Sequence, residues 1–166
     1  MFDAPTAAGY AELAAASNFS FLRGASHPHE MVAAAAALGL HALGVADRNS
    51  LAGVVRAHAA ARQHGVRLLV GARLVLRDGP EVLAYATDRA AYGRLSQLLS
   101  RGKRRAEKGD CALYVADLTD APDAVAGLLL IAVPPGDAVP PDAGFEAALG
   151  RLAGAAGGRT YLAATP

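Results

Sequence analysis

Two groups of side chains have types and spacing that could do chemistry. His27 and His29 form a His-x-His pair, a spacing that occurs in metal sites, but no cysteine and no second histidine pair stands near them. We therefore interpret this pair as part of an exposed helix start. Ser17 and Asp47 could join a histidine in a nucleophilic triad, yet the chain has no Gly-x-Ser-x-Gly elbow to support one. The glycine motifs that cradle phosphates, Gly-x-Gly-x-x-Gly and Gly-x-x-x-x-Gly-Lys, are also absent from the sequence.

A cluster of basic residues could meet the phosphates of nucleic acid through salt-sensitive contacts. Only Glu107 and Asp110 dilute this cluster, and no aromatic side chains interleave to stack on bases, so sequence-specific recognition is not indicated. The formal net charge of the chain is only +1, so any attraction to DNA must be local. A solvated loop is the simpler interpretation. The candidate nucleic-acid contacts are Arg101, Lys103, Arg104, Arg105 and Lys108.

The composition is typical of one folded domain. The chain has 166 residues, of which 53% are hydrophobic and 19% are charged, and we expect residues 1–166 to form a single domain. Cys111 is the only cysteine, which excludes an internal disulfide and a cysteine-cluster metal site and fits a reducing cytosol. Residues 1–9 lack the features of a signal peptide, and no run reaches the ~18 apolar residues of a membrane span. We therefore expect a cytoplasmic protein with no membrane partner.

Strand-like and helix-like segments alternate along the chain. Asp88 is a good N-cap for a helix that Gly102 would end, and Ser26 and Ser50 are the expected N-caps of two earlier helices. A turn at residues 78–79, between two extended segments, predicts a small hairpin insertion. The expected strands are 10–16, 42–46, 67–72, 128–133 and 160–164, and the expected helices are 27–38, 51–64, 89–101 and 145–156.

This alternation predicts βαβ units and a mainly parallel sheet, which is either open or curled into a barrel. In both forms the chemistry lies at the carboxyl ends of the strands. The positions to examine are therefore 16–18, 47–49 and 72–73, where the first three expected strands end.

Three segments around those strand ends resemble the PHP domain at the amino terminus of bacterial error-prone DNA polymerases, of the DNA polymerase III alpha subunit family. They are Tyr10 to Pro28, which ends in Ser-Asn-Phe-Ser-Phe-Leu-Arg-Gly-Ala-Ser-His-Pro, Ala36 to Arg56, and Gly65 to Leu74. Weaker similarity covers residues 92–118 and 127–135. The resemblance implies an α/β fold of the PHP type, a distorted β/α barrel. Since the barrel of the family is longer than this chain, we expect it to be incomplete at the carboxyl end.

The resemblance also implies which positions correspond to a metal site. In metal-binding members of that superfamily the first strand ends in His-x-His, the second in Asp-His and the third in Gly-Ala-Glu. Those positions are Ala14 and Ala16, Asp47 and Arg48, and Arg73 in this sequence. Methyl groups donate nothing to a metal and a guanidinium repels a cation, so we expect no metal, no other cofactor and no hydrolysis. We expect Arg48 or Arg73 to pair with Asp47 instead.

The leading hypothesis is a degenerate PHP-like domain of a damage-tolerant, translesion DNA polymerase, which supports the polymerase core in replication and repair and is inactive alone. The remainder of the polymerase chain would be its partner, together with DNA through that chain and other proteins of a mutagenesis complex. One alternative is a self-standing, metal-dependent phosphoesterase of the PHP family, and another is a module that binds DNA or a protein partner. Phe19, Phe21 and Leu22 are more apolar than a loop requires. They could pack against a neighbouring domain, but burial under the edge of the barrel is the simpler interpretation and the one we expect.

Overall fold

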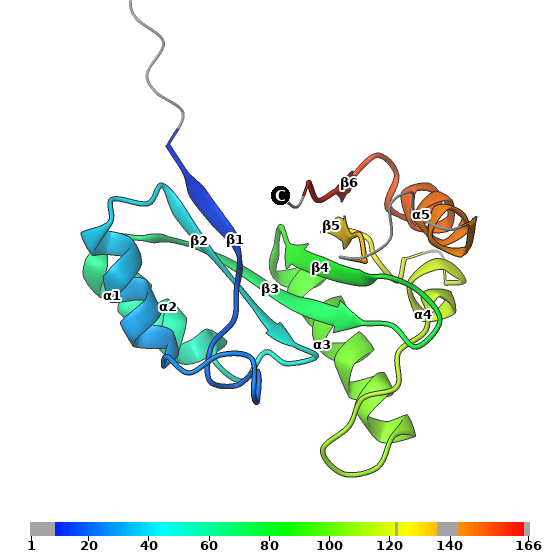
Figure 1. The fold of residues 1–166 in the computed structure, drawn as a ribbon, viewed down its shortest axis with the longest axis horizontal. Helices are drawn as coiled ribbons and strands as arrows, with labels where there is room; N and C mark the ends of the chain where they lie inside the picture. The colour runs from blue at the N-terminus through cyan, green and yellow to red at the C-terminus, as the bar shows by residue number, and fades with distance from the viewer. Residues whose placement is uncertain (1–8, 122, 136–142, 165–166) are drawn as a thin grey trace, which may run out of the picture.

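The structure is a computed structural model that describes residues 9–121, 123–135 and 143–164. Within these residues the chain forms one six-stranded sheet, in which every strand lies beside the next strand of the chain. The sheet curls into an open half-barrel, and helices cover its outer side (Figure 1). The strands are β1 (Ala11–Ala15), β2 (Ala42–Arg48), β3 (Arg67–Val75), β4 (Glu81–Ala86), β5 (Leu128–Val133) and β6 (Thr160–Leu162).

The sheet is parallel at both sides and antiparallel in the middle. β1, β2 and β3 run parallel, β4 is antiparallel to both β3 and β5, and β6 is parallel to β5. The change of direction comes from the predicted hairpin, in which Val75 pairs with Glu81. Because β3 continues unbroken through the parallel and antiparallel pairings, the hairpin is part of the main sheet and not a separate insertion. The predicted α/β class and incomplete barrel are confirmed, with a mixed sheet.

The helices divide into two groups along the sheet (Figure 1). α1 packs against α2, and together they cover β2 and β3, while α3 packs on β4 and α5 on β5, β6 and α4. Among the described residues, no helix is both long enough and apolar enough to cross a bilayer. The helices are α1 (Pro28–Ala37), α2 (Val54–His64), α3 (Arg89–Arg105), α4 (Val115–Thr119) and α5 (Ala143–Ala156).

The predicted helix starts are right in one case and wrong in two. Asp88 caps α3 as predicted, since its Oδ1 accepts from the Ala91 N–H at 2.8 Å. Ser26 is not a cap, because α1 begins one residue later, with His27 as its N-cap and the His27 N–H donating to Glu30 at 2.7 Å. Ser50 is not a cap either, because α2 begins only at residue 54.

The prediction that Gly102 ends α3 is also wrong, since the helix continues to Arg105. A Cβ at position 102 would lie 2.6 Å from the Cys111 Sγ and 2.8 Å from the Leu113 side chain. The glycine therefore allows the returning chain to pack closely against the helix. Its role is close approach, and not helix termination.

The concave face of the half-barrel is organised around Tyr85. A Cβ at Gly44 would lie 2.7 Å from the Tyr85 hydroxyl, and a Cβ at Gly71 would lie 2.5 Å from the ring. The two glycines thus leave room for the ring over β2 and β3, and its hydroxyl donates to the Leu13 carbonyl of β1. On the outer side, two further apolar clusters fix the helices, one with Val32, Val45 and Ala57, and one with Leu74, Leu95, Leu113, Leu128 and Leu152.

The loop between β1 and α1 does not bury the apolar side chains that we expected it to bury. Phe21 is 84% exposed and Leu22 is 88% exposed, so that prediction is wrong for both residues. Phe19 is half-buried, with the Arg56 guanidinium 5.8 Å from its ring centroid. Leu22 has a φ of 61°, a left-handed conformation that is uncommon for a side chain of this size.

Candidate functional site

A cavity of about 260 Å³ opens at the carboxyl ends of the first three strands. Four of the five positions that match metal-ligand positions line it together: Ala14, Ala16, Arg48 and Arg73. Ser20, Arg23 and Ala46 complete the lining, and neither Ser20 nor Arg23 was among the predicted site residues. The register of the sheet explains this grouping, since Arg48 pairs with Arg73 where β2 meets β3.

Asp47, the fifth position, is held away from solvent by neutral donors. Its side chain is buried, with 2% of the residue exposed. Oδ1 accepts from the Ser17 N–H at 2.7 Å and from the Ser20 hydroxyl at 2.6 Å, and Oδ2 accepts from the Ser17 hydroxyl at 2.7 Å. Both oxygens of Asp47 are therefore engaged in fixing the loop between β1 and α1 to the end of β2.

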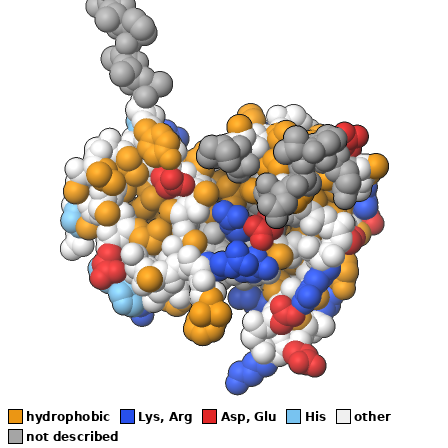
Figure 2. Space-filling model, viewed as in Figure 1, with side chains coloured by type: hydrophobic (Ala, Val, Ile, Leu, Met, Phe, Trp, Pro, Cys, Tyr) orange, Lys and Arg blue, Asp and Glu red, His pale blue; other side chains and the backbone are white. Residues whose placement is uncertain are grey.

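The predicted pairing of Arg48 or Arg73 with Asp47 is wrong. Arg48 donates to Oε1 of Glu81 at 2.7 Å, and Arg73 donates to Oε2 of the same carboxylate at 2.8 Å. One carboxylate thus joins two guanidiniums that would otherwise repel each other across the β2–β3 pair. We call this group the Arg48–Glu81–Arg73 bridge. In Figure 2 basic side chains gather at the centre of the visible face, with acidic side chains beside them.

The bridge sets the protonation of its carboxylate. Partial burial of Glu81 opposes ionisation, but the hydrogen bonds from Arg73 and Arg48 outweigh this effect and hold the pKa of Glu81 below its ordinary value. Glu81 is not among the site residues predicted from the sequence, although the predicted hairpin already places it near Arg73. Glu81 pairs with Val75, and Arg73 lies two residues before Val75 on the same face, which makes Arg73 and Glu81 diagonal neighbours.

The residues around the cavity do not fit a divalent metal. Its lining offers methyl groups, a hydroxyl and guanidiniums, and the nearby Asp47 already accepts three hydrogen bonds. Within the part of the chain that the structure describes, no three His, Cys, Asp or Glu side chains come together as a metal site. His27 and His29 stack with their ring centroids 5.6 Å apart, and the Nδ1 of His27 lies 3.0 Å from the Asn18 side-chain nitrogen.

One buried carboxylate pairs with some of the basic residues at the end of α3 and leaves the others without an ion pair. Arg105 forms a bidentate pair with Asp117 of α4 at 2.6 and 2.7 Å, and Arg101 lies 3.8 Å from the same carboxylate. The Asp117 side chain is only 6% exposed, and this burial opposes its ionisation. The hydrogen bonds from Arg105 and from the Tyr114 N–H outweigh that burial and lower the pKa of Asp117. Arg105 therefore joins α3 to α4.

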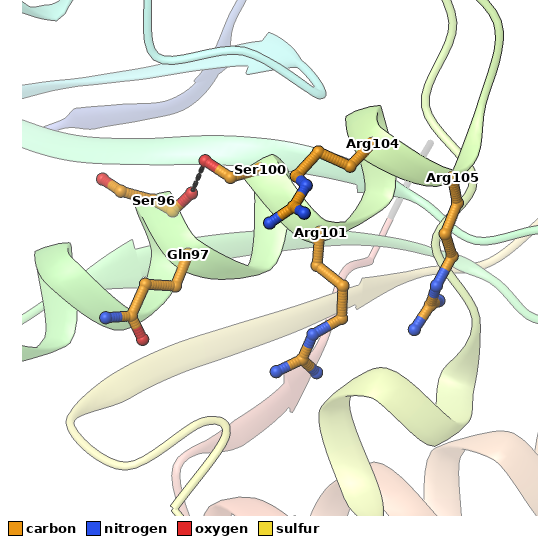
Figure 3. A pocket seen from close by; sticks show the side chains of 6 residues that line it. All are labelled: Ser96, Gln97, Ser100, Arg101, Arg104 and Arg105. Carbon is orange, nitrogen blue, oxygen red and sulfur yellow. Dashed lines mark hydrogen bonds between the residues drawn. The ribbon is translucent and has the colours of Figure 1, made fainter.

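The other basic residues of the cluster are more open. Figure 3 shows Arg101, Arg104 and Arg105 beside Ser96, Gln97 and Ser100 along one side of α3, where they line a shallow hollow. The Ser100 hydroxyl donates to the Ser96 carbonyl at 2.8 Å, so the helix itself uses that donor. Among the described residues, Lys103, Arg104 and Lys108 have no ion-pair partner. The cluster thus contains fewer available cations than the sequence indicates.

Comparisons with known proteins place this geometry in context. Residues 12–124 match the model of the PHP domain. The chain is 52% identical over 160 residues to an error-prone DNA polymerase of Caulobacter vibrioides, 51% identical over 162 residues to one of Rhodopseudomonas palustris, and 48% identical over 158 residues to error-prone DNA polymerase 1 of Rhizobium meliloti. These matches cover 94–95% of this chain but only 14% of each relative, so the chain spans about one seventh of their length.

A solved structure supports the fold. A protein from Bifidobacterium adolescentis, named as a metal-dependent phosphoesterase, superposes with a TM-score of 0.63 at 16% sequence identity. The superposition covers 87% of this chain and 75% of that protein. At this low identity, the likeness concerns the arrangement of strands and helices alone.

Proposed function

The chain belongs to the PHP domain family and is homologous to part of error-prone DNA polymerases, and from this premise we propose that it is a metal-independent structural domain of such a polymerase. In this proposal residues 1–166 belong to one PHP-like domain in the cytoplasm. Nucleotidyl transfer takes place in the remainder of the polymerase chain, which is the principal partner. DNA and other mutagenesis proteins are met through that larger protein.

The observation that carries the proposal is the Arg48–Glu81–Arg73 bridge. It connects the ends of β2 and β3 to the start of β4, at the edge where the ligands of a metal would converge. A metal at such a position draws several strands together through its ligands, and here two charge-assisted hydrogen bonds to one carboxylate do the same. The bridge stabilises the barrel edge without supplying a nucleophile or a general base.

The phosphoesterase alternative is less well supported by the same residues. Hydrolysis at this position would need a group that activates water, which is a metal or a free general base. The carboxylates close to the cavity are Asp47, whose oxygens accept from three donors, Glu81, whose oxygens accept from two arginines, and Glu12, whose oxygens accept from the Ala14 N–H and the Tyr10 hydroxyl. The two arginines also lower the pKa of Glu81, which makes it a weaker base.

The test is metal analysis combined with two activity assays on the natural full-length protein, purified without a chelator. We expect no stoichiometric zinc or manganese, no phosphomonoester hydrolysis, and DNA synthesis on a damaged template that continues after the chelator has been removed and only magnesium is restored. A reconstituted variant, Ala14→His with Ala16→His, Arg48→His and Arg73→Glu, is the positive control for metal uptake. Stoichiometric metal in the unmodified protein, lost together with a phosphatase activity, would refute the proposal.

A second candidate function is contact with the DNA backbone through the end of α3. The observation in its favour is that Lys103, Arg104 and Lys108 have no acidic partner among the described residues. Replacement of Lys103 and Arg104 by Gln should then reduce the slope of log affinity against log salt by about one for each lost phosphate contact. Arg62→Gln, on the exposed side of α2, is the matched control. An unchanged slope would leave only the structural role.

A further inference from the structure

The cavity at the carboxyl ends of β1, β2 and β3 has lost the ligands for a cation and gained the donors for an anion. We propose that it binds a small oxyanion of the phosphate class, held by guanidinium N–H groups of Arg23, Arg48 and Arg73. This inference goes beyond the proposed structural role, because that role requires no ligand in the cavity.

The arginines have hydrogen-bond donors to spare. A guanidinium carries five N–H donors, and in the Arg48–Glu81–Arg73 bridge Arg48 and Arg73 each use one nitrogen, NH1, on Glu81. Arg23 forms no ion pair with any of the described residues. Ser20, by contrast, is already engaged. Its hydroxyl donates to Asp47, and its oxygen accepts from the main-chain N–H of Arg48 at 2.9 Å. The ligand is therefore bound by the N–H donors of the arginines and not by Ser20.

The size of the cavity suits a phosphate group. Its volume of about 260 Å³ is many times the ~10–15 Å³ that one water molecule requires on a comparable measure. The space exists because Ala14, Ala16 and Ala46 present only methyl groups to it. Planar guanidinium groups match the oxygens of a phosphate through paired hydrogen bonds, which a lysine ammonium cannot do.

The charged groups that line the cavity also favour an anion. Three guanidiniums line it and no carboxylate does. The acidic groups close by are already engaged outside the lining: Glu81 in the bridge, Asp47 beneath the Ser17–Ser20 loop, and Glu12, which accepts from the Ala14 N–H. The side chains of Arg48 and Arg73 are 36% and 25% exposed, so water partly screens their attraction for a ligand, and binding should be strongest at low salt.

The experiment measures the binding of inorganic phosphate and of diphosphate to the natural full-length protein by calorimetry, at low salt, after chelator treatment and dialysis. We expect saturable binding that Arg23→Gln weakens about tenfold, through loss of one charge-assisted contact. Arg23 is exposed and has no ion pair among the described residues, so this variant should fold normally. Arg62→Gln should change nothing. Glu81→Gln should tighten binding, because it removes the competing carboxylate, even if it lowers stability.

The outcomes separate this inference from the structural role. Absence of saturable binding, or equal binding by Arg23→Gln and the unmodified protein, overturns the anion site and leaves the structural role intact. Binding that is present in protein purified without a chelator, absent after chelator treatment and restored by zinc or manganese overturns both, because a metal would then hold the anion.

Competition identifies the source of the phosphate group. The probes are a single-stranded oligonucleotide with a 5′ phosphate and the same oligonucleotide with a 5′ hydroxyl. If only the phosphorylated strand displaces inorganic phosphate, the site holds a strand end. If neither strand displaces it while diphosphate does, the site holds a free anion. Both results uphold the site, whereas equal displacement by the two strands, unaffected by Arg23→Gln, contradicts it.

Discussion

The hydroxyl of Tyr85 in β4 donates to the main-chain carbonyl of Leu13 in β1, a residue 72 positions earlier in the chain. The bond crosses the concave face of the sheet above Gly44 and Gly71, which are glycines because any larger residue would collide with the ring. It joins the edge strand β1 to the centre of the sheet, independently of the backbone ladder.

Tyr85→Phe should lower the free energy of unfolding by about 1 kcal/mol, since it removes one half-buried hydrogen bond and keeps the ring. Burial and the nearby Glu12 carboxylate raise the pKa of Tyr85 above its ordinary value of 10.0. The folded state therefore resists ionisation, so this residue's contribution is complete below pH 10.0 and declines as the pH rises above it. Urea unfolding on both sides of that pH measures both effects. Tyr92→Phe, at an exposed ring, is the control and should change neither.

Glu81→Gln should lower stability by about 1 kcal/mol near neutral pH, a modest value because water screens this partly exposed bridge. The pKa of Glu81 is lowered in the folded state, so the bridge contributes fully above the ordinary value of 4.5 and is lost as the pH falls through the lower folded value. Thermal unfolding measured across the acid range should show that the unmodified protein loses stability as the pH falls. The variant, which lacks this carboxylate, should lose less stability over the same range. Parallel curves for the two proteins would contradict this account.

Gly24→Ala should destabilise the domain by about 3 kcal/mol, the upper part of the range for overpacking. The new Cβ would lie 2.3 Å from the Ser17 carbonyl oxygen and 2.4 Å from that of Ala16, and backbone atoms at a strand end cannot move aside cheaply. Gly93→Ala on α3 is the matched control, because a Cβ there meets nothing within 4 Å. The control should gain about 0.5–1 kcal/mol from helix propensity. Chemical denaturation distinguishes the two signs directly.

Arg105→Gln should reduce stability several-fold more than Arg104→Gln. The first change leaves the buried Asp117 carboxylate without its bidentate partner, whereas the second removes a cation with no ion pair among the described residues. Comparison of urea midpoints at low and high salt measures the difference, and the Arg105 effect should persist in salt because Asp117 is shielded. Equal midpoints for the two variants would show that the pair is an ordinary surface contact.

The sequence predicts the order of the elements well because hydrophobic patterning and turn residues are local signals. The strand at 128–133, the hairpin at 78–79 and the Asp88 cap all depend on residues a few positions apart, and all three are confirmed. The grouping of Ala14, Ala16, Arg48 and Arg73 at one cavity also agrees with the structure, because strand ends of a parallel sheet meet at one edge.

The incorrect predictions depend on contacts between distant segments. Gly102 looks like a helix terminator until the return of Cys111 and Leu113 against it is known. The sequence predicts Asp47 as the partner of Arg48 or Arg73. Adjacent residues of a strand point to opposite faces, however, so Asp47 and Arg48 diverge, and Glu81 reaches the face of Arg48 only through the hairpin. Phe21 and Leu22 are residue types that are usually buried, and residue type alone does not indicate that both side chains of this loop are exposed.

The order of the sheet has a consequence for how the chain acquires its structure during synthesis. Because each strand pairs with the next strand in the sequence, β1, β2 and β3 can assemble before β5 and β6 have left the ribosome. Translation at about 5–20 residues per second gives such a pair seconds to form before its next neighbour emerges. We therefore expect nascent chains to gain protease resistance in steps from the amino end, with the cross-sheet tyrosine bond closing only once β4 is complete.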